Sequence, residues 1–145
     1  MKFQLLFLAA MKRELPDLLD QSNGITFDIG ATGKYVVKNA IPLGLPEWNF
    51  PNDMIPAANE TVSTIHCYHF LEHLSGESAI KFLREVERVL IPGGIFNFCM
   101  PYYSSHLMAQ DLTHKSFWNE ESFRNLFENQ MYDPAGKWKL HVHFQ

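Results

Sequence analysis

The chain has 145 residues, of which 46% are apolar and 19% are charged, so it can bury one hydrophobic core and does not have the composition of a disordered protein. Its formal net charge is −4 and its longest basic cluster is Lys12-Arg13, which argues against DNA or free RNA as a partner. Cys67 and Cys99 each lie within an apolar run, and we expect both to be reduced core residues.

The N-terminal segment, residues 1–22, carries apolar residues at helical spacing on both sides of Pro16, which predicts one or two helical segments. A lysine followed by a mainly apolar run also resembles a short signal peptide, but the apolar spacing continues past any cleavage point. We therefore favour an amphipathic segment of a cytoplasmic protein. No apolar run approaches the ~18 residues of a membrane span, so we expect no membrane partner.

Two short strands are predicted next. Residues 25–29 are rich in β-branched and aromatic residues, and glycines at positions 30 and 33 break the pattern after them. Four prolines between positions 40 and 58 leave room for only a short strand over 41–45.

A strand, a helix and a strand follow in the middle of the chain. Residues 61–68 are predicted to form a strand, and its nearly continuous apolar character from Ile65 onward suits a sheet covered on both faces. Ser75 is the expected N-cap of a helix over 77–90, which Pro92-Gly93-Gly94 ends before a strand over 95–100. This βαβ pattern predicts a parallel sheet, with ligands bound at the carboxyl ends of its strands.

The last third of the chain is predicted to contain a short helix that begins at Asn119 and a half-buried strand over 138–145, where apolar and polar residues alternate. A final strand would present an open edge, and we expect a homodimer to form through that edge or through the aromatic surface.

Four stretches resemble the short class I S-adenosylmethionine-dependent methyltransferases: FDIGATGK, YHFLEHL, FLREVERVLIPGGIFNFCMPYYSS and DLTHKSFW. The resemblance reaches over residues 25–127 and is most specific over 61–101. It implies one α/β domain over residues 1–145, with a Rossmann-like, mostly parallel sheet that is compact or truncated at its C-terminal end. It also implies S-adenosylmethionine as the cofactor.

The cofactor residues that the resemblance implies are Asp28, Gly30 and Gly33, in a turn that is shorter and less glycine-rich than the family's first motif. The family's ribose-binding acid has no direct counterpart, since Gly44 stands at about that place and Glu47 is the nearest carboxylate. Another alignment makes Asp28 the ribose ligand and KFQLLFLA the first strand. We prefer the first alignment, and the cofactor site looks eroded under both.

The stretch YHFLEHL places His69, Glu72 and His73 at i, i+3 and i+4, which share one face of a helical turn. His114 can approach from the loop after the next strand. Imidazoles and a carboxylate suit a divalent metal or a proton relay. The layout partly resembles metal-dependent methyltransferases that modify RNA ribose or quinone hydroxyls, with His69 in place of a glutamate.

We favour a site without metal, with His69, His73 or His114 as general base, Glu72 shaping the cofactor crevice, and Tyr102 and Tyr103 lining an acceptor pocket. The simpler alternative is that each side chain only makes structural hydrogen bonds.

The resemblance implies methyl transfer to a nucleophile, which we expect to be oxygen or nitrogen, and we lean toward an enzyme. The negative net charge leads us to expect a small molecule, such as a sugar, as the acceptor. The eroded glycine turn keeps open a different class of function, a binding or assembly module that has lost catalysis.

Overall fold

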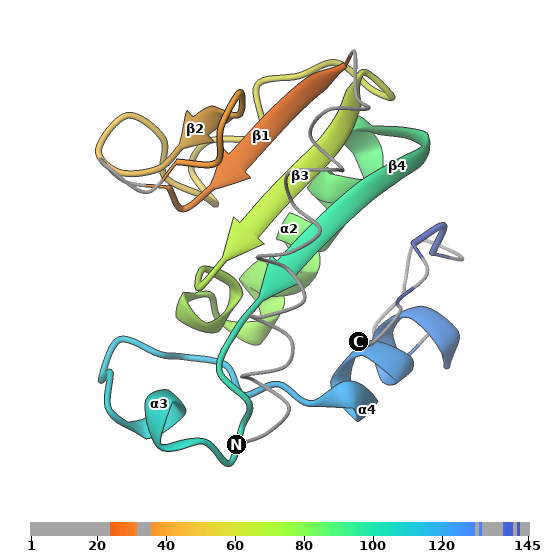
Figure 1. Ribbon diagram of the computed structural model, residues 1–145. Coiled ribbons are helices and arrows are strands. Elements are labelled where there is room, and N and C mark those ends of the chain that lie inside the picture. The colour runs from red at the N-terminus through yellow and green to blue at the C-terminus, as the bar shows by residue number, and fades with distance from the viewer. Residues whose placement is uncertain (1–23, 32–35, 130, 132–137, 141, 143–145) are drawn as a thin grey trace.

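The fold is taken from a computed structural model, which describes residues 24–31, 36–129, 131, 138–140 and 142. Within them, β1 (Ile25–Ile29), β2 (Ile41–Leu43), β3 (Val62–Tyr68) and β4 (Leu90–Cys99) form one sheet in the order β2-β1-β3-β4 (Figure 1). Every pairing within this sheet is parallel. The chain therefore has the predicted α/β architecture with a parallel sheet, and β1 lies between β2 and β3.

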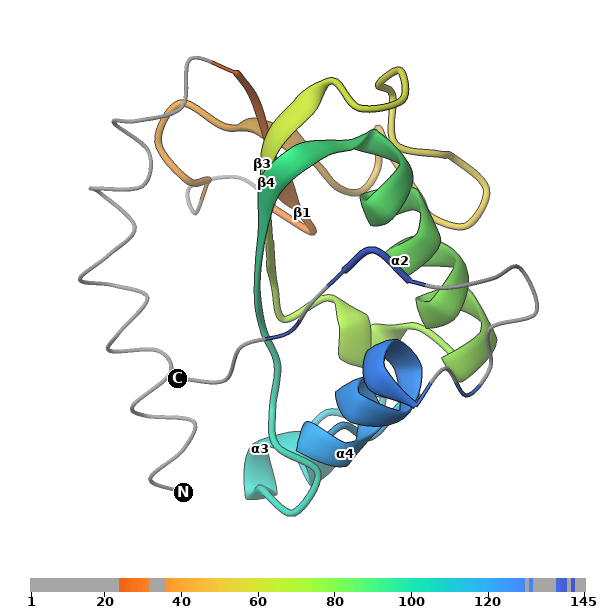
Figure 2. The ribbon, with the colours of Figure 1, turned by 90° about the vertical axis from the view of Figure 1, so that its right-hand side faces the viewer.

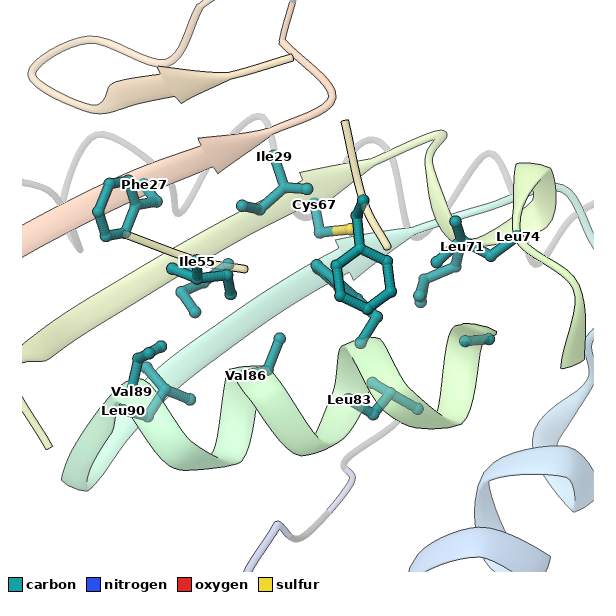
Figure 3. Packing of buried hydrophobic residues seen from close by; sticks show 14 of the residues in the cluster. Phe27, Ile29, Ile55, Cys67, Leu71, Leu74, Leu83, Val86, Val89 and Leu90 are labelled. Carbon is teal, nitrogen blue, oxygen red and sulfur yellow. The ribbon is translucent and has the colours of Figure 1, made fainter. Parts of the chain in front are cut away.

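Helix α2 (Gly76–Val89) covers one face of this sheet (Figure 2). It begins as predicted, because the Ser75 side chain accepts a hydrogen bond from the backbone N–H of Ser78. Side chains of α2, such as Leu83 and Val86, pack against Ile29 and Cys67 of the sheet (Figure 3). Cys67 and Cys99 are both buried free thiols, which confirms the prediction for the cysteines.

The start of β4 differs from the prediction. The strand follows α2 directly from Leu90, whereas Pro92-Gly93-Gly94 was expected to form a separate turn before it. Those residues bulge out of the pairing instead, because Val62 pairs with Leu90 whereas Thr64 already pairs with Ile95. Gly93 has φ +80°, which a residue with a side chain rarely adopts.

Short helical elements follow the carboxyl ends of the strands. The turn η1 (Leu71–His73) follows β3, and α3 (His106–Ala109), which the sequence did not predict, follows β4. The predicted last helix forms as α4 (Glu120–Phe123), continued by the π-helical turn η2 (Arg124–Glu128). Its N-terminus is a capping box, in which the side chains and backbones of Asn119 and Ser122 are hydrogen-bonded reciprocally.

The predicted C-terminal strand is absent from its described positions, 138–140 and 142. The burial still alternates there, because Trp138 is buried and Lys139 is exposed. Trp138 packs instead beneath the guanidinium of Arg84, whose Cζ lies 3.5 Å from the ring centroid. A contact with α2 thus replaces sheet pairing at the start of this segment.

The predicted helical segment over residues 1–22 lies outside the described residues. Among the residues that are described, no helix combines the length and the apolar character that crossing a membrane would require.

The face of the sheet that points away from α2 carries buried polar groups. Asp28, His66 and Asn97 are partners across β1, β3 and β4, so their side chains form one row. Asp28 is 3% exposed and His66 is fully buried. The Nδ1 atom of His66 lies 2.9 Å from the Tyr68 hydroxyl, whereas its Nε2 has no hydrogen-bond partner. This row contains titratable groups that the fold keeps away from water.

Candidate functional site

A pocket of about 440 Å³ lies at the carboxyl ends of three strands. Gly30 follows β1, Gly44 follows β2 and His69 follows β3, and all three line it. The rest of its described lining is mainly aromatic or polar, with three aliphatic residues. The aromatic and polar residues are Trp48, Phe50, Phe70, Asn49, His73, Ser75, Ser78 and Lys115, and the aliphatic ones are Leu45, Pro51 and Leu74. The volume is within the range of ~300–1,000 Å³ that is usual for small-molecule sites. Ligands were predicted to bind at this edge, where the carboxyl ends of the parallel strands lie. The pocket is beside β1, from which the chain continues to β2 on one side and then to β3 on the other.

The glycine turn is packed against the chain's own atoms. Gly30 has φ +75°, and a Cβ at this position would lie 3.2 Å from side-chain atoms of Phe70. A Cβ at Gly44 would lie 2.6 Å from the carbonyl oxygen of Ala31. Gly33, the third glycine considered, lies outside the described residues. Both described glycines therefore permit close approach between segments of the protein itself.

Asp28 and Glu47 do not line the pocket. The Asp28 carboxylate accepts a hydrogen bond of 2.7 Å from the backbone N–H of Val37. Burial raises the pKa of Asp28, and the hydrogen bond from Val37 partly opposes that shift. Glu47 is exposed in the proline-rich segment after β2. Cofactor binding by these two carboxylates stays a prediction. The Asp28 carboxylate already accepts a hydrogen bond from the protein itself, from the backbone of Val37.

The backbone at the end of β3 turns sharply and presents His69 at the pocket. His69 has φ +55°, and its backbone N–H donates to the Cys99 carbonyl at the end of β4. Its Nδ1 lies 3.4 Å from Oε1 of Glu72, and its side chain is 46% exposed. Interaction with the side chain of Cys99, and then with the Glu72 carboxylate, raises the pKa of His69 to about 10. At neutral pH His69 is therefore a cation, and of the three candidate bases it is the least suited to accept a proton.

Glu72, His73 and His114 come together although His114 is distant in sequence. One ligand atom from each lies within 4.8 Å of the other two. The rings of His73 and His114 meet edge to face, with centroids 4.8 Å apart. Glu72 is fully buried, and neither of its carboxylate oxygens has a hydrogen-bond partner among the described residues. His69 lies beside the same carboxylate, so the four residues of the predicted constellation do meet at one place.

Backbone hydrogen bonds hold the loop of His114 against η1. The N–H groups of Lys115 and Ser116 both donate to the Glu72 carbonyl, at 2.7 and 3.2 Å. The Ser116 hydroxyl donates to the Leu71 carbonyl at 3.1 Å. These bonds fix the distance between His114 and the Glu72–His73 turn, and they bring the Lys115 side chain to the pocket.

Several pocket residues were missed by sequence reasoning. Lys115, Asn49 and Trp48 lie in irregular segments, where no periodic pattern points to a site. Conversely, Tyr102 and Tyr103 do not line this pocket. The Tyr102 hydroxyl donates to the Glu120 carboxylate at 3.1 Å, so this tyrosine joins the end of β4 to α4.

A second hollow of about 720 Å³ lies between the start of α2 and α4. Its described lining includes Ile80, Phe117, Trp118 and Leu126, and it contains no histidine. Of the two pockets, only the first has histidines, His69 and His73, in its described lining.

Comparison with known families adds one match. A family model described as a methyltransferase domain matches residues 34–98. The match begins after the glycine turn, so it leaves out Asp28 and Gly30, and it covers β2, β3, η1, α2 and most of β4. No curated protein and no solved structure matches the chain. Over residues 34–98 the resemblance inferred from the sequence is confirmed.

Proposed function

We propose that this chain, whose residues 34–98 match a family model described as a methyltransferase domain, transfers a methyl group from S-adenosylmethionine to an oxygen or nitrogen atom of a small-molecule acceptor. Methyl transfer from that donor is the general activity that the family supports. The acceptor class and the type of nucleophile are our proposal.

The observation that carries the proposal is the pocket at the carboxyl ends of β1, β2 and β3 in a parallel sheet. In open α/β sheets, ligands bind outside the carboxyl ends of the strands. The volume of about 440 Å³ suits a small organic molecule. The net charge of −4 disfavours free nucleic acid as the acceptor.

The lining of the pocket fits the chemistry of the cofactor, which is part apolar ring and part charged amino acid. Trp48, Phe50 and Phe70 offer an aromatic wall for a flat ring. The Lys115 ammonium and the His69 imidazolium offer positive charge for a carboxylate. When bound, S-adenosylmethionine supplies an electrophilic methyl group on a sulfonium. The chain then has to hold the acceptor in line with it, and such positioning supplies most of the acceleration in a displacement of this kind.

A proton leaves an oxygen or nitrogen nucleophile during the transfer, and His73 is placed to accept it. His73 lines the pocket, and its Nδ1 lies 3.0 Å from the Thr113 hydroxyl. That hydroxyl donates its own proton to Asp111 Oδ1 at 2.7 Å, so Nδ1 of His73 must be the donor in their contact. The Nε2 atom of neutral His73 is then an acceptor, which is the form that a general base needs.

A second candidate function follows from the glycine turn. Phe70 occupies the space beside Gly30, and the Ala31 carbonyl occupies the space beside Gly44. A turn filled by the chain itself favours a binding module that keeps the fold and has lost the cofactor. The two candidates differ in whether the pocket binds the cofactor or its product.

Calorimetric titration with S-adenosylhomocysteine tests this difference. We expect saturable binding of one ligand per chain with a Kd in the micromolar range, about −8 kcal/mol or weaker. A titration with adenosine alone serves as the control, and it should bind more weakly because it lacks the carboxylate that Lys115 and His69 attract. Absence of heat up to millimolar ligand, in protein that a thermal melt shows to be folded, would reject the methyltransferase proposal and leave the binding module.

A further inference from the structure

We propose that Glu72, His73 and His114 form a binding site for one divalent transition-metal ion of the zinc class. The site lies at the edge of the 440 Å³ pocket, because His73 belongs to both. The inference concerns the chain's own ligand atoms, and metal binding by itself does not depend on the proposed methyl transfer.

The burial of the Glu72 carboxylate favours a bound cation. Glu72 is 0% exposed, and both of its oxygens lack a hydrogen-bond partner. Nδ1 of His69 lies 3.4 Å from Oε1 and supplies charge on that side, which leaves Oε2 without a partner. A buried carboxylate oxygen without a partner is expensive to maintain. A cation bound between this carboxylate and the two imidazoles would satisfy it.

The hydrogen bonds of the two histidines leave Nε2 of each ring available to a metal ion. Nδ1 of His73 donates to the Thr113 hydroxyl, since the hydroxyl proton is directed at Asp111. Nδ1 of His114 lies 2.9 Å from the Met108 carbonyl oxygen, which can only accept, so this nitrogen also carries a proton. In its neutral form, each imidazole with a proton on Nδ1 therefore keeps the Nε2 lone pair. Metal-binding histidines have this arrangement, in which the second nitrogen donates to a carbonyl or another oxygen.

The three side chains are also held close together by the fold. The three ligand atoms lie within 4.8 Å of one another, and an ion at ~2.0–2.2 Å from each requires only small side-chain movements. The hydrogen bonds from Lys115 and Ser116 to the Glu72 carbonyl hold the loop of His114 in place. The Asp111 carboxylate is 44% exposed, and its Oδ2 lies 3.7 Å from Nε2 of His114, so it adds negative charge beside the cluster.

The donor set points to the class of ion. Two imidazoles and one carboxylate suit Zn²⁺, Fe²⁺ or Co²⁺, whereas Mg²⁺ and Ca²⁺ prefer oxygen ligands alone. Three protein ligands leave at least one position open. If the proposed function holds, an oxygen of the acceptor would fill that position and lose its proton more easily. In the metal-bound state His73 would not be the base, because a lone pair that holds a metal cannot accept a proton, and the acceptor's proton would pass to solvent water instead.

The test is a titration of metal-free protein with Co²⁺, followed by its visible absorption, and displacement of Co²⁺ by Zn²⁺. No methyl donor is needed, so the result is independent of cofactor binding. We expect one Co²⁺ per chain, with bands typical of nitrogen and oxygen ligands. The variants are His73→Asn and His114→Asn, because the asparagine amide can still donate where Nδ1 does but offers no counterpart of Nε2. Each should weaken binding by roughly 100-fold.

The matched control is His106→Asn, which removes an exposed imidazole outside the cluster and should bind Co²⁺ as the unchanged chain does. Thr113→Val tests the orientation of His73 and should weaken binding by about 10-fold or more. A chain that takes up no Co²⁺ or Zn²⁺ would overturn the proposal. So would His73→Asn and His114→Asn variants that are folded by circular dichroism and bind with unchanged affinity.

Discussion

The carbonyl oxygen of Ala31 occupies the space in which a side chain at position 44 would begin. A Cβ built at Gly44 would lie 2.6 Å from that oxygen, which is closer than real Cβ contacts allow. The contact joins the turn after β1 to the turn after β2, and the backbone N–H of Gly30 donates to the Leu43 carbonyl beside it. The place where the family resemblance implies a ribose-binding acid therefore has no room for any side chain.

Replacing Gly44 with alanine is expected to destabilise the protein by about 1–3 kcal/mol, because the two turns must move apart. Gly76→Ala is the matched control, since a Cβ at the first position of α2 meets nothing within 4 Å. This control should be neutral or should stabilise by up to ~1 kcal/mol. Urea denaturation of both variants measures the difference, and equal midpoints would contradict the steric account of Gly44.

Arg88 should contribute more to stability than its partly exposed position on α2 suggests. Its guanidinium bonds to both carboxylate oxygens of Glu85 and to the carbonyls of Ile55 and Ala57, which ties α2 to the proline-rich segment. Arg88→Ala would leave Glu85, which is 5% exposed, without its main partner. We expect a loss of about 2–4 kcal/mol in the free energy of unfolding.

Lys81→Ala is the control for Arg88. It breaks an ion pair with Glu77 on the exposed side of the same helix, where both side chains are well solvated. The expected effect is within about 0.5 kcal/mol. Chemical denaturation of the two variants under one condition distinguishes them, and similar losses would show that Arg88 acts only as a surface charge.

His66 should make the stability depend on pH in the acidic range. Burial lowers its pKa to about 4, from an ordinary value of 6.5. Between these two values the unfolded chain binds a proton at His66 and the folded chain does not. The free energy of unfolding therefore has its full value above pH 6.5. It falls by roughly 2–3 kcal/mol as the pH decreases toward 4, because the unfolded chain takes up a proton that the folded chain does not.

The pH dependence is isolated with the variant His66→Gln, which cannot titrate at this position. Urea denaturation at several pH values between 4 and 7 should give a steeper fall for the unchanged chain than for the variant. Parallel curves would mean that His66 takes up its proton with the same pKa in the folded and the unfolded chain. Other groups would then cause the acid sensitivity.

Lys115 should contribute to the affinity for S-adenosylhomocysteine through its charge. It lines the pocket and is exposed, so Lys115→Met is expected to weaken binding about 3- to 5-fold at low salt. Lys81→Met, on α2 and outside the pocket, should bind the ligand as before. The difference between the two variants should shrink at high ionic strength, because salt screens an exposed charge. A loss that does not respond to salt would indicate disturbed packing instead.

Local sequence patterns were enough to predict the strands of the sheet and the helix that covers it. The strands at residues 25–29 and 62–68 and the Ser75 cap of α2 follow from local preferences of a few neighbouring residues. The same local patterns misjudged two places. The glycines before residue 95 form a bulge within β4, and residues 138–140 pack on α2 rather than pairing as a strand.

The contact of His114 with the other three polar groups depends on long-range contacts of the folded chain. His69, Glu72 and His73 are neighbours in sequence, and their spacing predicts their meeting at the end of β3. That His114 joins them depends on hydrogen bonds between the 113–116 loop and the carbonyls of η1, which no periodic pattern encodes. Hydrophobic periodicity reports which face of an element is buried, because burial repeats with the geometry of the backbone. The course of an irregular loop depends on a few specific long-range contacts, and these exist only once the sheet has formed.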